Sequence, residues 1–171
     1  MQDNLNTIDI GSKTDGAGAL LSNFFPYVFT FDNIPCRSME GLLQSLKFPD
    51  SGTQRLVCQL TESDAKKAGD GAVAPDWKER QTLYWQDRKF PRDSKTYQDL
   101  LDRTYNTLKR NKLFQTALLA TGDALPVHSI GKTDPTDTIL TIDELCQRLM
   151  RIRAELQREQ SIVPITEQEF V

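Results

Sequence analysis

The alternation of hydrophobic and polar positions is most regular between residues 37 and 49, where it predicts a short buried helix. Its apolar positions recur at i, i+3, i+4 and i+7 and would form one stripe: Met39, Leu42, Leu43 and Leu46. Ser38 can cap the helix at its start, and Pro49 disfavours its continuation. A second, polar stripe lies about 115° round the helix and consists of Glu40, Gln44 and Lys47. These three side chains would point from one edge of a buried helix, either as an ordinary solvated flank or as part of a site.

The rest of the pattern predicts a mostly helical chain with a few short strands. Further helices are expected over residues 53–60, 63–68, 77–85, 94–108, 111–120 and 141–157. Gly69 suits the end of the second of these, and Thr141 with Glu144 forms a capping box at the start of the last. Strand-like segments are 8–10, 27–31 and 34–36. Because the βαβ alternation of a doubly wound sheet is absent, we expect an α+β fold, a mostly helical single domain with a small N-terminal β-sheet.

Composition places the chain among ordinary globular proteins and narrows its partners. The 171 residues carry a net charge of −3, with a pI of about 5.2. Proteins that bind nucleic acid by neutralising many phosphates are usually basic, so only a local basic patch remains compatible with such binding. No apolar run reaches the roughly 18 residues of a membrane span, and residues 1–4 do not resemble a signal peptide. The three cysteines lack metal-ligand spacing, so we expect reduced thiols, no metal site and a cytoplasmic location.

Several motifs together resemble one known family. The first is Ser38-x-Glu40-x-x-x-Gln44-x-x-Lys47-Phe48, preceded by Leu21-Ser22-Asn23-Phe24; the others are Ala65-Lys66-Lys67-Ala68-Gly69, residues 118–123 and Leu149-Met150-x-x-Arg153. In this order and spacing they are similar to the NADAR (YbiA-like) family. The resemblance covers residues 20–156, so residues 1–19 are interpreted as an N-terminal extension with an edge strand and residues 157–171 as a C-terminal tail.

The resemblance implies an enzyme that cleaves N-glycosidic bonds of ribose-containing nucleotides. Part of the family removes ADP-ribose from modified guanine bases, which would make the partner an ADP-ribose-containing nucleotide or an ADP-ribosylated nucleic acid base. Lys47 would attack the anomeric carbon to form a Schiff base, provided that burial lowers its pKa, and Glu40 would move protons. No cofactor is implied. Cleavage of riboflavin-pathway ribosylamino pyrimidines, a non-catalytic nucleotide reader and an interaction protein that merely keeps the fold remain alternatives.

The resemblance also suggests which residues bind substrate. They are Ser22, Asn23, Phe24, Gln44, Lys66, Trp85, His128, Gly131 and Asp134. Several have a simpler explanation: Phe24 as core packing, Lys66 as a favourable charge at a helix end, and His128 as a loop histidine bonded to the backbone. Gly131 would let backbone amides approach a phosphate. The chain departs from the family at Gly41, where many members have histidine, and in the loop 128–135, where many carry a Trp-Gly pair.

Overall fold

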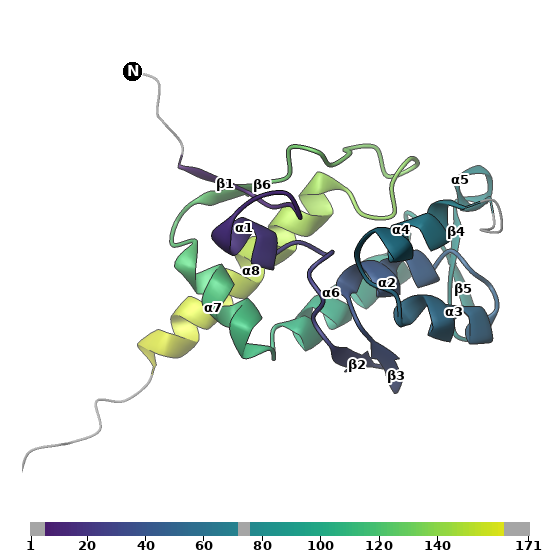
Figure 1. Ribbon diagram of the computed structural model, residues 1–171, viewed down its shortest axis with the longest axis horizontal. Coiled ribbons are helices and arrows are strands. Elements are labelled where there is room, and N and C mark those ends of the chain that lie inside the picture. Colours follow the sequence, from purple (N-terminus) through teal and green to yellow (C-terminus); the bar gives the residue numbers. More distant parts are fainter. Residues whose placement is uncertain (1–5, 72–75, 163–171) are drawn as a thin grey trace, which may run out of the picture.

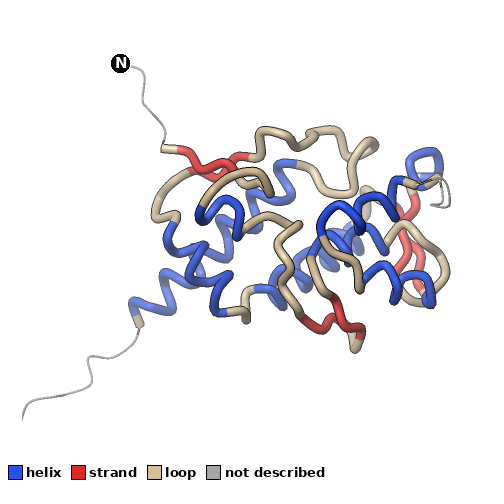
Figure 2. The backbone as a smooth tube through the Cα atoms, viewed as in Figure 1, coloured by secondary structure: helices blue, strands red, loops and turns tan. Residues whose placement is uncertain are grey.

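The computed structural model describes residues 6–71 and 76–162, and helices dominate this part of the chain (Figure 2). The helices are α1 (Gly16–Leu20), α2 (Met39–Ser45), α3 (Ser51–Cys58), α4 (Glu62–Asp70), α5 (Trp77–Arg80), α6 (Lys95–Leu108), α7 (Lys112–Ala120) and α8 (Ile142–Ser161). The strands are β1 (Thr7–Asp9), β2 (Phe29–Phe31), β3 (Ile34–Cys36), β4 (Thr82–Trp85), β5 (Arg88–Pro91) and β6 (Leu125–Val127). The predicted α+β class is therefore confirmed. No helix in the described part of the chain is long and apolar enough to cross a bilayer.

Helix α2 lies at the centre of one half of the molecule, packed against α3 and α4 (Figure 1). Ser38 caps it as predicted: its Oγ accepts a hydrogen bond from the amide of Gly41 at 2.9 Å and donates one to the carbonyl of Leu60 at 3.0 Å. All seven residues of α2 are buried. The chain then tightens into a turn, where the amide of Lys47 bonds to the carbonyl of Gln44 at 3.3 Å. The helix is thus shorter than predicted, and its polar stripe is buried along with its apolar stripe.

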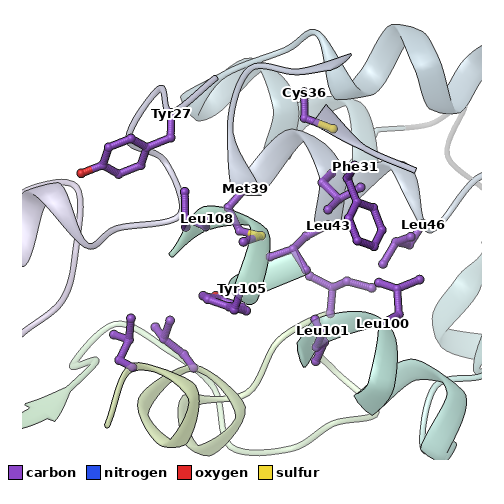
Figure 3. Packing of buried hydrophobic residues seen from close by; sticks show 14 of the residues in the cluster. Tyr27, Phe31, Cys36, Met39, Leu43, Leu46, Leu100, Leu101, Tyr105 and Leu108 are labelled. Carbon is purple, nitrogen blue, oxygen red and sulfur yellow. The ribbon is translucent and has the colours of Figure 1, made fainter. Parts of the chain in front are cut away.

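The apolar stripe of α2 packs on α6. Figure 3 shows Met39 and Leu43 of α2, and Leu46 just after it, close to Leu100, Leu101 and Tyr105 of α6, and all of them belong to the buried core. Burial of each aliphatic side chain contributes about 1.5–3 kcal/mol to folding. This packing fixes the rotation of α2 about its axis, and the rotation determines which way the polar stripe points.

Gly41 explains how α2 can approach the end of α3. A Cβ atom there would lie 2.7 Å from the carbonyl oxygen of Leu60 and 3.0 Å from that of Val57. Both contacts are with backbone, which cannot move aside cheaply. Glycine at this position therefore serves the close packing of α2 against the α3–α4 connection.

The strands pair differently from the single N-terminal sheet that the sequence predicted. Strands β2 and β3 form an antiparallel hairpin, as do β4 and β5. Strand β1 pairs in parallel with the distant β6, with Ile8 opposite Pro126. The expectation was wrong here because parallel pairing needs a long crossover and leaves no local signal in the sequence.

Three local expectations also need correction. Residues 77–85 were expected to form a helix, but α5 stops at Arg80 because Gln81 adopts a left-handed backbone, with φ of 48°. The chain continues as β4, whose side chains alternate between buried and partly buried, as in a half-covered strand. Helix α4 continues through Gly69 to Asp70, and Gly71 is the residue that follows its end. Helix α8 runs on to Ser161, and residues 163–171 of the expected tail lie outside the described residues.

Candidate active site

The polar stripe of α2 faces a cleft of about 870 Å³. Its walls come from α2, the C-terminal end of α4, helix α5, residues 22–24 and the segment 128–141 between β6 and α8, which we call the late loop. Five lysines and four acidic residues line it, so the cleft is less acidic than the chain as a whole, whose net charge is −3. Clefts that bind small molecules usually enclose about 300–1,000 Å³. The cleft is therefore of the right size for a nucleotide.

Lys47 is buried against one wall of the cleft, with 2% of its surface exposed. Its Nζ donates hydrogen bonds to Oδ1 of Asp70 at 2.8 Å and to the carbonyl of Gly69 at 3.3 Å. It also lies 5.3 Å from the centre of the Trp77 ring. Burial lowers the pKa of Lys47, and the hydrogen bond and charge of Asp70 offset only part of this effect. The amine is therefore easier to deprotonate than a lysine in water.

Glu40 lies two helical turns before Lys47 and is also buried, at 7% exposure. Its Oε1 accepts a hydrogen bond from Nε2 of Gln44 at 2.8 Å. Burial raises the pKa of Glu40, although the hydrogen bond from Gln44 and the charges of Lys66 and Lys47 oppose the change. A carboxyl with a raised pKa and an amine with a lowered pKa thus share one cleft. Shifts in these directions bring the pKa values of both groups closer together, which suits a pair that exchanges protons with a bound substrate.

Gln44 holds the carboxyl of Glu40 and leaves one of its own atoms without a partner. Its side chain is 1% exposed, and with Nε2 donating to Glu40 its Oε1 has no partner among the described residues. A Cβ atom at Gly69 would lie 1.9 Å from this Oε1, so glycine is needed where α4 meets α2. A buried acceptor without a partner is costly. The close contact between α2 and α4 is therefore made at the expense of this hydrogen bond.

The segment 22–24 forms a neighbouring part of the wall. Oδ1 of Asn23 accepts a hydrogen bond from the hydroxyl of Tyr105 at 2.8 Å, and its carbonyl accepts one from the amide of Glu40 at 3.0 Å. Oγ of Ser22 accepts a hydrogen bond from the amide of Phe24 at 3.2 Å. All three residues line the cleft and are only partly buried. The segment is thus held against α2 and α6 while part of its surface stays accessible.

The late loop supplies the opposite wall. Nδ1 of His128 lies 2.5 Å from the carbonyl oxygen of Ile10, which ties the loop to the end of β1. The amide of Gly131 donates to the carbonyl of His128 at 3.0 Å, so it is not available to a phosphate as the sequence had suggested. A Cβ atom at Gly131 would lie 2.3 Å from Cδ2 of His128. Glycine here lets the loop fold tightly over the imidazole ring.

Comparisons with known proteins agree with this architecture. Residues 16–154 match the family described as Bacteriophage protein GP30.3. The chain belongs to this family. It is 32% identical over 155 residues to an uncharacterized 17.1 kDa protein in the Gp30-rIII intergenic region of Enterobacteria phage T4. The alignment covers 89% of this chain and 100% of the phage T4 protein.

The fold of this GP30.3 family member is similar to that of the E. coli protein YbiA. The NMR structure of YbiA matches 98% of this chain and 97% of its own, with a TM-score of 0.60 and 18% sequence identity. At this level of identity the likeness concerns the fold. It confirms the YbiA-like architecture that the sequence motifs predicted.

The structure brings most of the suggested residues to the cleft, but not all. Trp85 is buried outside it, and its Nε1 donates to Oδ2 of Asp32 at 2.8 Å. Asp134 also lies outside the cleft, where its Oδ1 accepts a hydrogen bond from the amide of Thr136 at 2.8 Å. The sequence argument also missed many residues that line the cleft, among them Asp70, Trp77, Lys78, Lys132 and Asp137. Only Asp70 had a local signal, because it lies four residues after Lys66 on one helix.

Neutralising Asp70 tests whether it controls the protonation of Lys47. Asn at this position keeps a hydrogen-bond acceptor but loses the charge that raises the pKa of Lys47, so that pKa should fall further. If the neutral amine is required for turnover, the limb of the pH–rate profile that belongs to Lys47 moves to lower pH in Asp70→Asn. The measurement is kcat/KM over about pH 4 to 11, a range that spans the ordinary pKa values of a glutamate and a lysine. An unchanged profile with a lower rate would give Asp70 a purely structural role.

Proposed function

We propose that the chain is an N-glycosidase that removes ADP-ribose from modified guanine bases. The observation that supports this most strongly is the pairing of Lys47 and Glu40 in one cleft, with burial shifting their pKa values in opposite directions. Catalytic groups are often found where burial moves pKa values toward the working pH. The resemblance of the α2 motif to the NADAR family gives the pair its chemical assignment.

The reaction starts with the neutral amine of Lys47. Nζ forms a bond to the anomeric carbon of the ribose while the bond from that carbon to the base nitrogen breaks, and its electron pair leaves with the base. Glu40 supplies the proton that the departing base takes up, and the carboxylate left behind accepts a proton from the attacking amine. The ring oxygen then leaves the anomeric carbon and takes this proton from Glu40, which opens the sugar and forms a protonated Schiff base on Lys47. Water adds to this carbon, and the amine is released together with the free sugar.

The remaining groups in the cleft suit a nucleotide. Trp77 and Phe24 offer aromatic surface for a base or a ribose, and Trp77 already holds a cation against its ring. Lys66 reaches the cleft from α4, where its Nζ lies 3.1 Å from Oδ2 of Asp70. These groups support a substrate that is aromatic and anionic.

A non-catalytic nucleotide reader is the second candidate, because the ion pair with Asp70 favours the charged form of Lys47. Such a protein would use the charged amine only to bind phosphate. It would be stabilised by ADP-ribose, by about 2.7 kcal/mol at 100 times the dissociation constant, but would release nothing. Binding alone therefore does not separate the two candidates, whereas product formation does.

The test is mass analysis of products after incubation with a panel of substrates. The panel contains oligonucleotides with ADP-ribosylated guanine, free NAD and ribosylamino pyrimidine intermediates. We expect unmodified guanine and free ADP-ribose from the first substrate, and no such release with the variant Glu40→Gln. Binding of ADP-ribose without any product from the panel would favour the reader.

A further inference from the structure

The late loop carries a charged cluster that faces the same cleft as Lys47. Asp137 binds two lysines at once: its Oδ2 lies 2.5 Å from Nζ of Lys132, and its Oδ1 accepts a hydrogen bond from Nζ of Lys78 on α5. All three residues line the cleft, and each side chain is about half exposed. Within this cluster two positive charges thus share one negative charge.

The same arrangement occurs at the wall that holds Lys47. There Asp70 binds both Lys47 and Lys66, again two lysines on one carboxylate. Both clusters line the same cleft. Trp77 also lines it, with its ring 5.3 Å from the amine of Lys47, and directly precedes Lys78 in the chain.

Lys132 and Lys78 are positioned by bonds that do not involve Asp137. The carbonyl of Lys132 accepts a hydrogen bond from the amide of Ile142 at 2.9 Å, at the start of α8. On the other side, Nε2 of Gln81 donates to the carbonyl of Thr136 at 3.0 Å, which holds the end of α5 against the late loop. The backbone around both lysines would therefore stay in place if the carboxylate of Asp137 turned away.

We propose that Lys78 and Lys132 form a subsite for the diphosphate of the substrate, in which phosphate oxygens replace the carboxylate of Asp137. Exposed lysine–carboxylate pairs are weak, whereas a diphosphate offers several acceptor oxygens and more charge to the same two amines. Asp137 would then keep the two amines together until a substrate arrives. This inference deepens the proposed function, on which the identity of the diphosphate as part of a nucleotide rests.

The test is calorimetric titration with inorganic pyrophosphate at fixed, low ionic strength. Lys132→Ala and Lys78→Ala should each weaken binding about tenfold, the loss of one charged hydrogen bond. Asp137→Asn should tighten binding several-fold, because the competing carboxylate is gone. Lys89→Ala on β5, an exposed lysine outside the cleft, is the matched control and should bind as the wild type does.

The result for Asp137→Asn decides the assignment. If Asp137 were needed only to hold the two lysines in place, its substitution would weaken the binding of pyrophosphate and not tighten it. Weaker or unchanged binding in this variant, or unchanged binding in both alanine variants, would overturn the subsite. The outcome is separate from that of the glycosidase proposal. If pyrophosphate binds with the expected pattern but no substrate is cleaved, the subsite stands and the glycosidase fails; if substrate is cleaved but both alanine variants bind normally, only the subsite fails.

Discussion

Lys47→Arg is expected to lower turnover by about 10³-fold or more, the loss typical of removing a nucleophile. Arginine keeps the positive charge, so a lysine that only binds phosphate would be replaced with modest loss. A nucleophile must instead become neutral, which arginine does not do at any pH that the protein tolerates. The structure shows why Lys47 can become neutral: it is buried, and burial lowers its pKa. The measurement is the initial rate with the substrate that the panel identifies.

The control for this experiment is Lys67→Arg on α4. Lys67 is exposed, and its Nζ lies 3.9 Å from Oδ1 of Asp64. It does not line the cleft, so this variant should keep the wild-type rate. Because Arg is larger than Lys at a buried position, Lys47→Met serves as a second variant with similar volume, and thermal melts of both confirm that they fold. Retention of more than about a tenth of the rate in Lys47→Arg would mean that water, activated by Glu40, is the nucleophile.

Arg92→Met is expected to destabilise the fold by about 3–5 kcal/mol. Arg92 is 1% exposed, and its guanidinium binds both carboxylate oxygens of Glu144, at 2.9 and 2.7 Å. Its Nε also donates to the carbonyl of Thr138 in the late loop at 3.0 Å, and the guanidinium stacks 4.7 Å from the centre of the Tyr97 ring. Methionine fills the space but leaves a mostly buried carboxylate without its cation. Equilibrium denaturation by urea gives the change in the free energy of unfolding.

An exposed ion pair on the neighbouring helix provides the matched comparison. Lys95 binds Asp99 one turn along α6, and both side chains are largely exposed. Lys95→Met should therefore cost less than about 1 kcal/mol. Equal losses in the two variants would contradict the view that burial of the Arg92–Glu144 pair sets its contribution to stability.

The features that the sequence could predict depend on residues that lie close together in the chain. The period of Met39, Leu42 and Leu46 identified α2, and Ser38 marked its start, because a helix and its cap involve residues at most four apart. The capping box of Thr141 and Glu144 was found for the same reason. The shared stripe of Glu40, Gln44 and Lys47 followed directly from that period, and the structure places all three in one cleft.

What the sequence could not predict depends on distant partners. Asp70, the direct partner of Lys47, is 23 residues away in sequence, and the pairing exists only because α4 packs on α2. Trp77 was placed in a longer helix, since nothing local revealed the left-handed backbone at Gln81 that turns the chain into β4. The pairing of Asp137 with Lys78 spans 59 residues. Contacts of this kind are set by packing of whole elements, not by local propensity.

The most direct test of the central claim, that Lys47 forms a covalent bond to the substrate, is reduction with borohydride during turnover. Borohydride delivers hydride to the carbon of the Schiff base and converts it to a stable secondary amine. We expect intact-protein and peptide mass spectrometry to show a ribosyl adduct on Lys47 in the wild type and in Lys67→Arg, and none in Lys47→Arg. Full turnover with no adduct on Lys47 would contradict the account, because the glycosidic bond would then be broken without the lysine.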